Sequence, residues 1–253
     1  MTINIYSLIT AIFVGGVAGY LGSLMLTKKM ALVGDALGHV ALPGMGLALL
    51  LGLNISLGAF IFLFFGVLAI WFLESKTELA TETLVGIIFV LSLAIGFLVT
   101  PQPDLIEALV GDISRVNFFD TALAIILSIL VFFVVKNIYN KIILSSLSED
   151  LAAANKINAK KLNLIYLFAI AVIVAIGVKV AGSLLIGALV IIPAATAKNI
   201  SKNMRQYVCW SLIFGALSCL SGVLLSVFVG FPAGPLTILA GILFFGFSLI
   251  FKI

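Results

Sequence analysis

A succession of long apolar segments, separated by short polar connections, constrains this sequence more than any other feature. About 20 mostly apolar residues allow an α-helix to cross a bilayer, where a spanning segment must pair all of its own backbone polar groups. The sequence of 253 residues therefore predicts an all-α, polytopic membrane helix bundle. The expected segments are Ile5–Leu26, Asp35–Leu51, Ser56–Leu73, Thr83–Val99, Phe118–Val135, Leu162–Val180, Ser183–Ala197, Tyr207–Val229 and a last one that ends at Lys252.

The number of transmembrane helices is eight or nine, depending on the segment Ser183–Ala197. This segment is short and contains Pro193, so it either crosses the membrane or is re-entrant. Lysine and arginine in short loops mark the cytoplasmic side. Nine crossings place the N-terminus outside and the C-terminus inside, with all the basic clusters on one side; these are Lys28–Lys29, Lys136–Lys161 and Lys198–Arg205.

The composition excludes several classes of protein. Apolar residues make up 63% of the chain and charged residues only 9%, whereas a soluble domain has about 45–50% and about 25%. We expect residues 1–253 to form a single transmembrane domain. The net charge of +4 comes from scattered loop residues, which gives no sign of nucleic-acid binding. Cys209 and Cys219 fall within one expected helix and are interpreted as small apolar residues.

One carboxylate and the only histidine of the chain lie four residues apart inside an apolar segment. On an α-helix Asp35 and His39 would share a face. Ionisable groups at membrane depth are costly and usually face a protein interior or a wet cavity, so they mark a function. The pair is interpreted as either a metal-binding pair or a structural hydrogen bond between helices. Pro43 and Gly44 follow at once and predict a kink just past the pair.

Other sequence features limit the activities that this chain can have alone. The sequence contains no Gly-Lys dipeptide and hence no P-loop for ATP, and it has no His-Glu-x-x-His motif. We therefore expect a transport subunit that is not an enzyme. In the longest polar stretch, Ser146–Glu149 resembles a capping box, Asp150 adds an acidic group, and a short surface helix is predicted from Leu147 to Lys156.

Two segments carry a family resemblance. Gly34-Asp35-Ala36-Leu37-Gly38-His39-Val40-Ala41-Leu42-Pro43-Gly44 and residues 181–197, with Pro193-Ala194-Ala195-Thr196-Ala197, resemble the zinc/manganese permease subunits of bacterial ABC importers, the ABC-3 family. One departure is Gly38, where the family often has serine, so this chain lacks a hydroxyl group near the pair. Weaker similarities are found at Glu82–Gly86, Gly111-Asp112 and Glu149–Asn155.

The resemblance implies a fold similar to the vitamin B12-type importer and a multi-pass subunit of the bacterial cytoplasmic (inner) membrane. It implies a homodimer around a central path, a cytoplasmic ATP-binding-cassette ATPase dimer and an extracytoplasmic metal-binding protein. Asp35 and His39 would contact the transported divalent ion, zinc first and manganese or iron as alternatives, with no other cofactor. The segment that would couple this subunit to the ATPase comprises Glu149, Asp150, Leu151, Ala153 and Asn155.

Two other classes of function stay open on the sequence. A secondary transporter driven by protons could use Asp35 and His39 as a proton relay. Such transporters often contain internal repeats with paired broken helices, and no convincing repeat is found here. A structural membrane scaffold is the third reading, and the Asp–His pair inside a helix argues against it.

Overall fold

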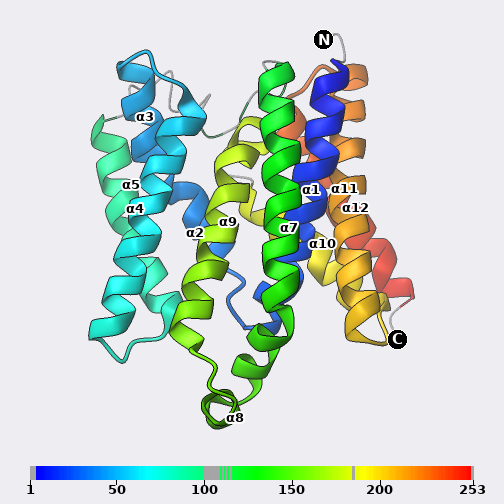
Figure 1. Cartoon of the computed structure of the whole chain (residues 1–253). Helices are drawn as coiled ribbons and strands as arrows, with labels where there is room; N and C mark the ends of the chain where they lie inside the picture. The colour runs from blue at the N-terminus through cyan, green and yellow to red at the C-terminus, as the bar shows by residue number, and fades with distance from the viewer. Residues whose placement is uncertain are drawn as a thin grey trace.

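The computed structural model describes residues 4–99, 109, 111, 113, 116–183 and 186–251. The regular structure in these residues is helical (Figure 1). The predicted all-α bundle is thus confirmed for the described part of the chain. The named helices are α1 Ile5–Thr27, α2 Val33–Val40, α3 Leu42–Leu50, α4 Ile55–Lys76, α5 Thr81–Val99, α7 Phe118–Leu147, α8 Glu149–Ala154, α9 Ala159–Ala181, α10 Ile186–Ile200, α11 Met204–Val229 and α12 Ala233–Ile250.

Among the described residues, eight helical stretches are long and apolar enough to cross a membrane, one of them being the consecutive pair α2 and α3. Helix α10 is a ninth, shorter apolar helix. It begins beside Gly38, inside the bundle, and ends at the pocket that contains Lys198 and Lys29. Helix α10 therefore runs back toward the end of the bundle at which α9 begins. The chain ends lie at opposite ends of the bundle (Figure 1), as nine passes require.

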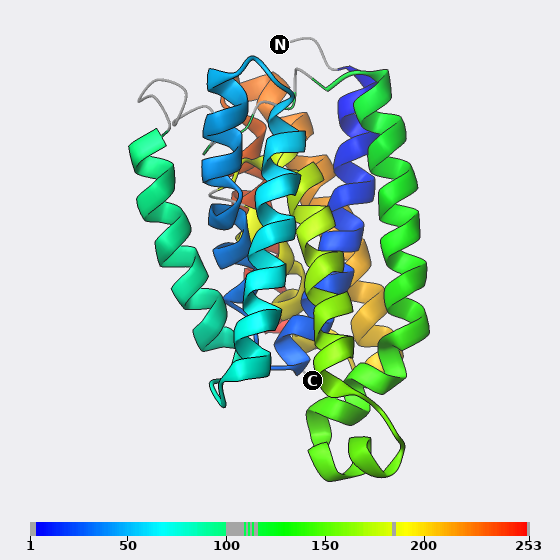
Figure 2. The ribbon, with the colours of Figure 1, turned by 60° about the vertical axis from the view of Figure 1, so that its left-hand side comes forward.

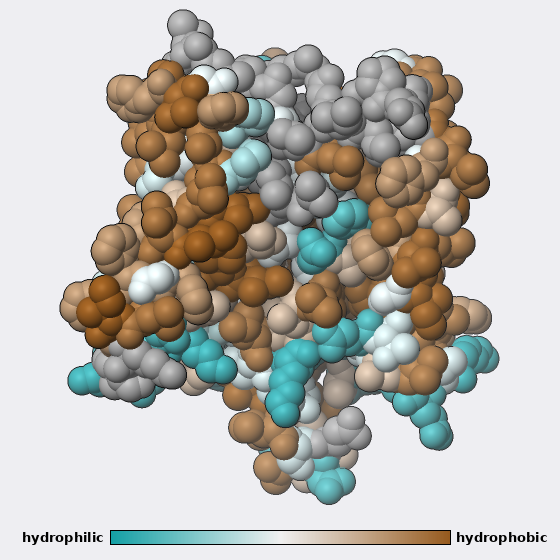
Figure 3. All heavy atoms as spheres, turned by 180° about the vertical axis from the view of Figure 1, so that it is seen from behind, coloured by the Kyte–Doolittle hydropathy of each residue, from teal (hydrophilic) through white to brown (hydrophobic). Residues whose placement is uncertain are grey.

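The basic connections lie together at one end of the molecule. Lys29, Lys198 and Lys202 line one pocket, and α8 projects from the same end of the bundle (Figures 1 and 2). Figure 3 shows hydrophilic residues gathered toward this end, below a broad hydrophobic surface. By the positive-inside rule this end is cytoplasmic. Asp112, one of the residues of the weaker family similarities, lies outside the described residues.

Helix α7 is longer than predicted. We expected the fifth span to end at Val135, but the helix continues to Leu147. The reason is tertiary packing, since Ile142 is buried and Ile138 packs against the core. The predicted capping box at Ser146 is also wrong. Ser148 caps α8 by accepting a hydrogen bond from the backbone N–H of Leu151 at 3.3 Å, whereas the Ser146 hydroxyl donates to a carbonyl within α7.

Glycines allow the central helices to approach closely. A Cβ at Gly15 would lie 2.6 Å from the sulfur of Cys219, and a Cβ at Gly19 would overlap the carbonyl of Ser211. Gly15 and Gly19 of α1 therefore pack directly against α11. Since helices in lipid associate through close van der Waals packing, these small residues hold α1 at the centre of the bundle.

A polar network joins four segments at the cytoplasmic end. Lys28 donates to the side-chain oxygen of Asn163 at 2.7 Å, and the amide of Asn163 donates to Glu74 at 3.0 Å and to Thr81 at 3.1 Å. Burial lowers the pKa of Lys28 to about 8, and the Glu74 carboxylate opposes that shift. Asn163 is buried and connects the end of α1, the end of α4, the start of α5 and the start of α9.

We expect Asn163→Ala to reduce stability by about 1–3 kcal/mol, because it removes the hydrogen-bond acceptor of the partly buried Lys28 and leaves Glu74 with Thr81 as its remaining donor. Thermal unfolding in detergent, followed by fluorescence of the two tryptophans, measures this. Asn155→Ala is the control, since that exposed amide makes one local hydrogen bond to Leu151. Equal melting temperatures for the two variants would contradict a stabilising role for the network.

Candidate functional site

Asp35 and His39 both lie on the short helix α2. Asp35 is in its first turn and His39 in its last turn. The helix ends at Val40, and α3 starts at Leu42 with Pro43 at the beginning of its first turn. The break expected just past the pair is present, because proline has no backbone N–H to continue the hydrogen bonding of α2. The pair therefore occupies the last turns before a discontinuity inside the bundle.

The environment of His39 fixes its chemistry. Its ring is buried, with 8% of its surface exposed, and packs edge-on against Phe89 of α5 with the ring centroids 5.2 Å apart. Its Nδ1 lies 3.0 Å from the backbone carbonyl oxygen of Asp35. A carbonyl can only accept, so Nδ1 carries the proton and donates it. The Nε2 lone pair is then the one available to a ligand.

The carboxylate of Asp35 is only partly buried. Within the described part of the chain, it makes no hydrogen bond, and His39 bonds only the backbone of its own helix. The alternative reading of the pair as a hydrogen bond between helices therefore has no counterpart among the described contacts. A carboxylate oxygen and an imidazole nitrogen are left for another group to use.

The two segments that carried the family resemblance pack against each other. Helix α10 runs antiparallel to α2, with Val190 near Gly34 and Gly187 near Asp35. A Cβ at Gly187 would lie 2.6 Å from the backbone nitrogen of Asp35, so only glycine leaves room at this crossing. One turn further along α2, a Cβ at Gly38 would lie 2.5 Å from the carbonyl oxygen of Ser183. The position of Asp35 is thus set by α10.

Sequence reasoning did not find the residues that surround the pair. Phe89 is one of many phenylalanines, and no sequence signal distinguishes it from the others. Ser183 was predicted only as the first residue of the short segment Ser183–Ala197, but its buried hydroxyl has no hydrogen-bond partner among the described residues. Gly187 lies within the second resembling segment, and its spacing alone does not reveal that it contacts Asp35.

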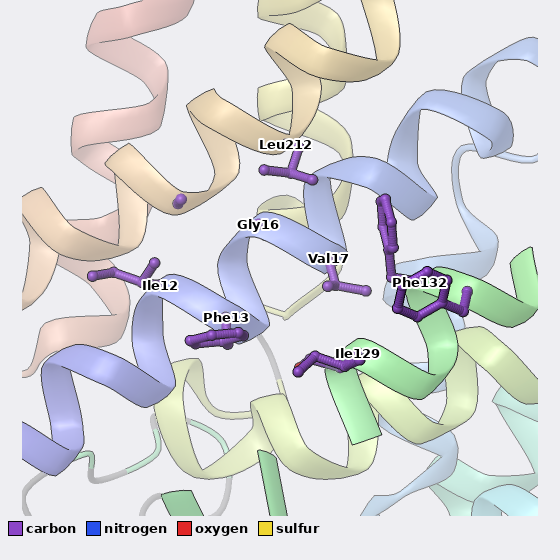
Figure 4. A pocket seen from close by; sticks show the side chains of 10 residues that line it. Ile12, Phe13, Gly16, Val17, Ile129, Phe132 and Leu212 are labelled. Atoms are coloured by element: carbon purple, nitrogen blue, oxygen red, sulfur yellow. The ribbon is translucent and has the colours of Figure 1, made fainter. Parts of the chain in front are cut away.

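The pair is not part of a larger ligand cluster in the chain as described. Among the residues searched, there is no group of three or more His, Cys, Asp and Glu side chains that could hold a metal ion. A distinct pocket of about 410 Å³ between α1, α7 and α11 is lined by Ser128 and apolar residues (Figure 4). It has no charged side chain and is unsuited to a cation. In the described part of the chain, the predicted pair thus has no third candidate ligand of these types beside it.

The predicted coupling residues form the short helix α8 and its C-terminal cap. Leu151 is 51% exposed, and Ala153 and Asn155 are also exposed, whereas Ala152 is buried. Asp150 is exposed as well and lies in the first turn. Glu149 is the first residue of the helix. An exposed leucine on a helix that projects from the bundle is a surface suited to contact with another protein.

The profile of the ABC 3 transport family matches residues 2–252. The chain belongs to this family. It is 32% identical to the high-affinity zinc uptake system membrane protein ZnuB of Haemophilus influenzae, over 96% of this chain and 95% of the relative. It is 28% identical to the manganese transport system membrane protein MntC of Listeria monocytogenes, over 97% of this chain and 89% of the relative.

Among solved structures, the fold is similar to PsaBC from Streptococcus pneumoniae in complex with Fab, with a TM-score of 0.83, 27% identity, and coverage of 96% of this chain and 89% of that chain. The expectation of an importer-type helix bundle is confirmed by this likeness. As a member of the ABC-3 family with eight membrane-length helices in its described part, the chain is a multi-pass protein of the bacterial inner membrane.

We expect Gly187→Ala to destabilise the protein by about 1–3 kcal/mol, because the added methyl group would overlap the backbone of Asp35 and separate α2 from α10. The melting temperature in detergent measures this. Gly86→Ala in α5 is the matched control, because a Cβ there meets nothing within 4 Å. A Gly187→Ala variant as stable as the control would show that α10 does not constrain Asp35.

Proposed function

We propose that this chain is the permease subunit of an ABC importer for divalent transition metal ions, with zinc as the substrate. The observation that carries the proposal is the environment of Asp35 and His39. The two side chains have a carboxylate and an Nε2 lone pair unused in the described structure, on a helix inside an apolar bundle. Such groups are costly at membrane depth and are retained for ion pathways.

The ligand chemistry supports a transition metal as substrate. A neutral imidazole combined with a carboxylate binds zinc and other borderline divalent ions. The hydrogen bond from Nδ1 of His39 to the Asp35 carbonyl is the kind of outer contact that orients a metal-binding histidine and selects its tautomer. The carboxylate of Asp35 offsets part of the charge of the ion in a medium of low dielectric constant.

The small number of ligands supports a transport site shared within a homodimer. A closed site of four protein ligands holds zinc tightly, whereas transport requires both entry and release. Two ligands from each of two copies around a central path would complete a site that can still open. We propose that residues 1–253 form one permease domain in each copy.

Zinc is favoured over manganese by the relative from Haemophilus influenzae, which is named for zinc uptake and covers nearly the whole chain. Manganese is the second candidate, because the relative from Listeria monocytogenes is named for manganese transport. The ligand pair itself suits both ions. Uptake of zinc and of manganese into vesicles that contain the assembled transporter decides between the two ions. Zinc should inhibit manganese uptake more strongly than manganese inhibits zinc uptake.

Energy would come from a separate chain. The exposed residues of α8, Leu151, Ala153 and Asn155, would contact a cytoplasmic ABC ATPase and transmit its motion. Asp150 and Glu149 at the start of the helix would belong to the same contact. An extracytoplasmic metal-binding protein would deliver the ion at the opposite end of the bundle.

We expect Asp35→Asn and His39→Ala each to abolish metal uptake while leaving the amount of folded protein nearly unchanged. Asparagine keeps the shape but removes the charge that offsets the cation, and alanine removes the nitrogen ligand. Uptake of zinc into vesicles that contain the assembled transporter measures the effect. Glu82→Gln is the matched control, because that exposed carboxylate lies in the first turn of α5, away from the pair.

The same vesicles separate the importer from a proton-driven transporter. Without a proton gradient, the wild-type complex should accumulate zinc only when ATP reaches the ATPase. Accumulation driven by an imposed proton gradient in the absence of ATP would reject the ABC importer and favour the proton-relay alternative. Normal uptake by both Asp35→Asn and His39→Ala would reject the metal-binding pair.

We expect the double substitution Leu151→Asp with Ala153→Asp to abolish ATP-dependent uptake without preventing insertion in the membrane. Both residues are exposed, so two new carboxylates would disturb a docking contact and not the core. Co-purification of the ATPase and ATP-dependent uptake are the measurements. Leu79→Asp, at an exposed leucine of the α4–α5 connection, is the matched control. Normal uptake by the double variant would disprove the role of α8.

A further inference from the structure

A second pocket, of about 560 Å³, lies at the cytoplasmic end of the bundle, away from the Asp35–His39 pair, and is lined mostly by polar residues. It is formed where α1 ends, α10 ends and α11 begins. Its charged lining residues are Lys29, Lys198 and Lys202. The three lysines are exposed, and no carboxylate contributes to the lining. The pocket therefore has a strong positive potential and suits an anion.

Tyr207 closes the inner wall of the pocket. It is only 6% exposed, and its hydroxyl is buried without a hydrogen-bond partner in the described structure. A buried oxygen is out of reach of a group that enters the pocket from solvent. The groups of the lining that can attract an anion are therefore the three exposed lysines.

We propose that this pocket binds the phosphate group of an anionic glycerophospholipid from the cytoplasmic leaflet. Basic pockets between transmembrane helices on the cytoplasmic side are suited to anionic lipid head groups. Lys29, Lys198 and Lys202 neutralise the phosphate. A zwitterionic lipid has the same phosphate but no net charge, so the lysines select against it.

The surrounding surface favours a lipid over free phosphate. Trp210 lies one turn beyond Tyr207 on α11, is 39% exposed and stacks near Phe214, as expected for an aromatic residue at the membrane interface. Helices α1 and α11 also form two sides of the apolar pocket shown in Figure 4, which is lined by the exposed Ile12 and the half-buried Leu212 and has no charged residue in its lining. This pocket gives acyl chains a place along the same two helices.

Native mass spectrometry of the full-length protein in detergent, with equal amounts of dioleoyl phosphatidylglycerol and dioleoyl phosphatidylcholine, tests the proposal. We expect the wild type to retain phosphatidylglycerol with a preference of at least about tenfold. Each lysine near a membrane surface contributes about fivefold to binding of an anionic lipid, so Lys198→Gln with Lys202→Gln should weaken it by about 25-fold.

The matched control is Lys141→Gln with Lys161→Gln. It removes the same charge from exposed lysines at the same end of the protein, outside the pocket. Retention equal to that of the wild type in this control supports a defined site. Equal losses in the control and pocket variants would instead show diffuse surface attraction and overturn the proposal.

Three further outcomes would also overturn it. The first is equal retention of the two lipids by the wild type. The second is displacement of phosphatidylglycerol by excess inorganic phosphate, which would identify a site for the free anion. The third is complete loss of the lipid when the ATPase is added, which would show that the pocket is a protein contact.

Discussion

The close approach of α2 and α10 is the interaction on which the candidate site depends. Gly187 lets the backbone of α10 reach the backbone of Asp35, and Gly38 lets α2 reach the carbonyl of Ser183. A helix of eight residues has little stability of its own. Helix α2 is kept in place by these contacts and by the packing of His39 on Phe89. The geometry of the candidate pair therefore depends on three helices, α2, α5 and α10.

Large parts of the fold could be predicted from the sequence because a bilayer permits so few solutions. The starts of α1, α5 and α7 and the break near Pro43 follow from apolar length and from proline chemistry. The end of α7 could not be predicted. Polar residues such as Lys136 suggest that the span stops at Val135, and the sequence does not show that Ile142 beyond them is buried. The capping residue was mispredicted for the same reason. Helix α7 continues past Ser146, so Ser148 is the residue that caps α8.

From the sequence, the two residues of the candidate pair could be identified, but the residues around them could not. Asp35 and His39 are the unusual residues of an apolar segment, and their spacing places them on one face of a helix. Their surroundings come from distant parts of the chain: Phe89 from α5, and Ser183 and Gly187 from the region of α10. Contacts between residues so far apart in sequence produce no periodic pattern that could predict them. The chain also has 23 glycines and 20 phenylalanines, so the residue type does not single out Gly187 or Phe89.

The hydrogen bond between Nδ1 of His39 and the carbonyl of Asp35 also fixes how the imidazole ring can be used. Nδ1 donates to the backbone of its own helix, so Nε2 is the acceptor that the ring offers to its surroundings. In the proposed role of the pair, an ion could therefore bind His39 at one edge of the ring only. A histidine held in this way is a directional contact whose orientation is set by the helix that carries it.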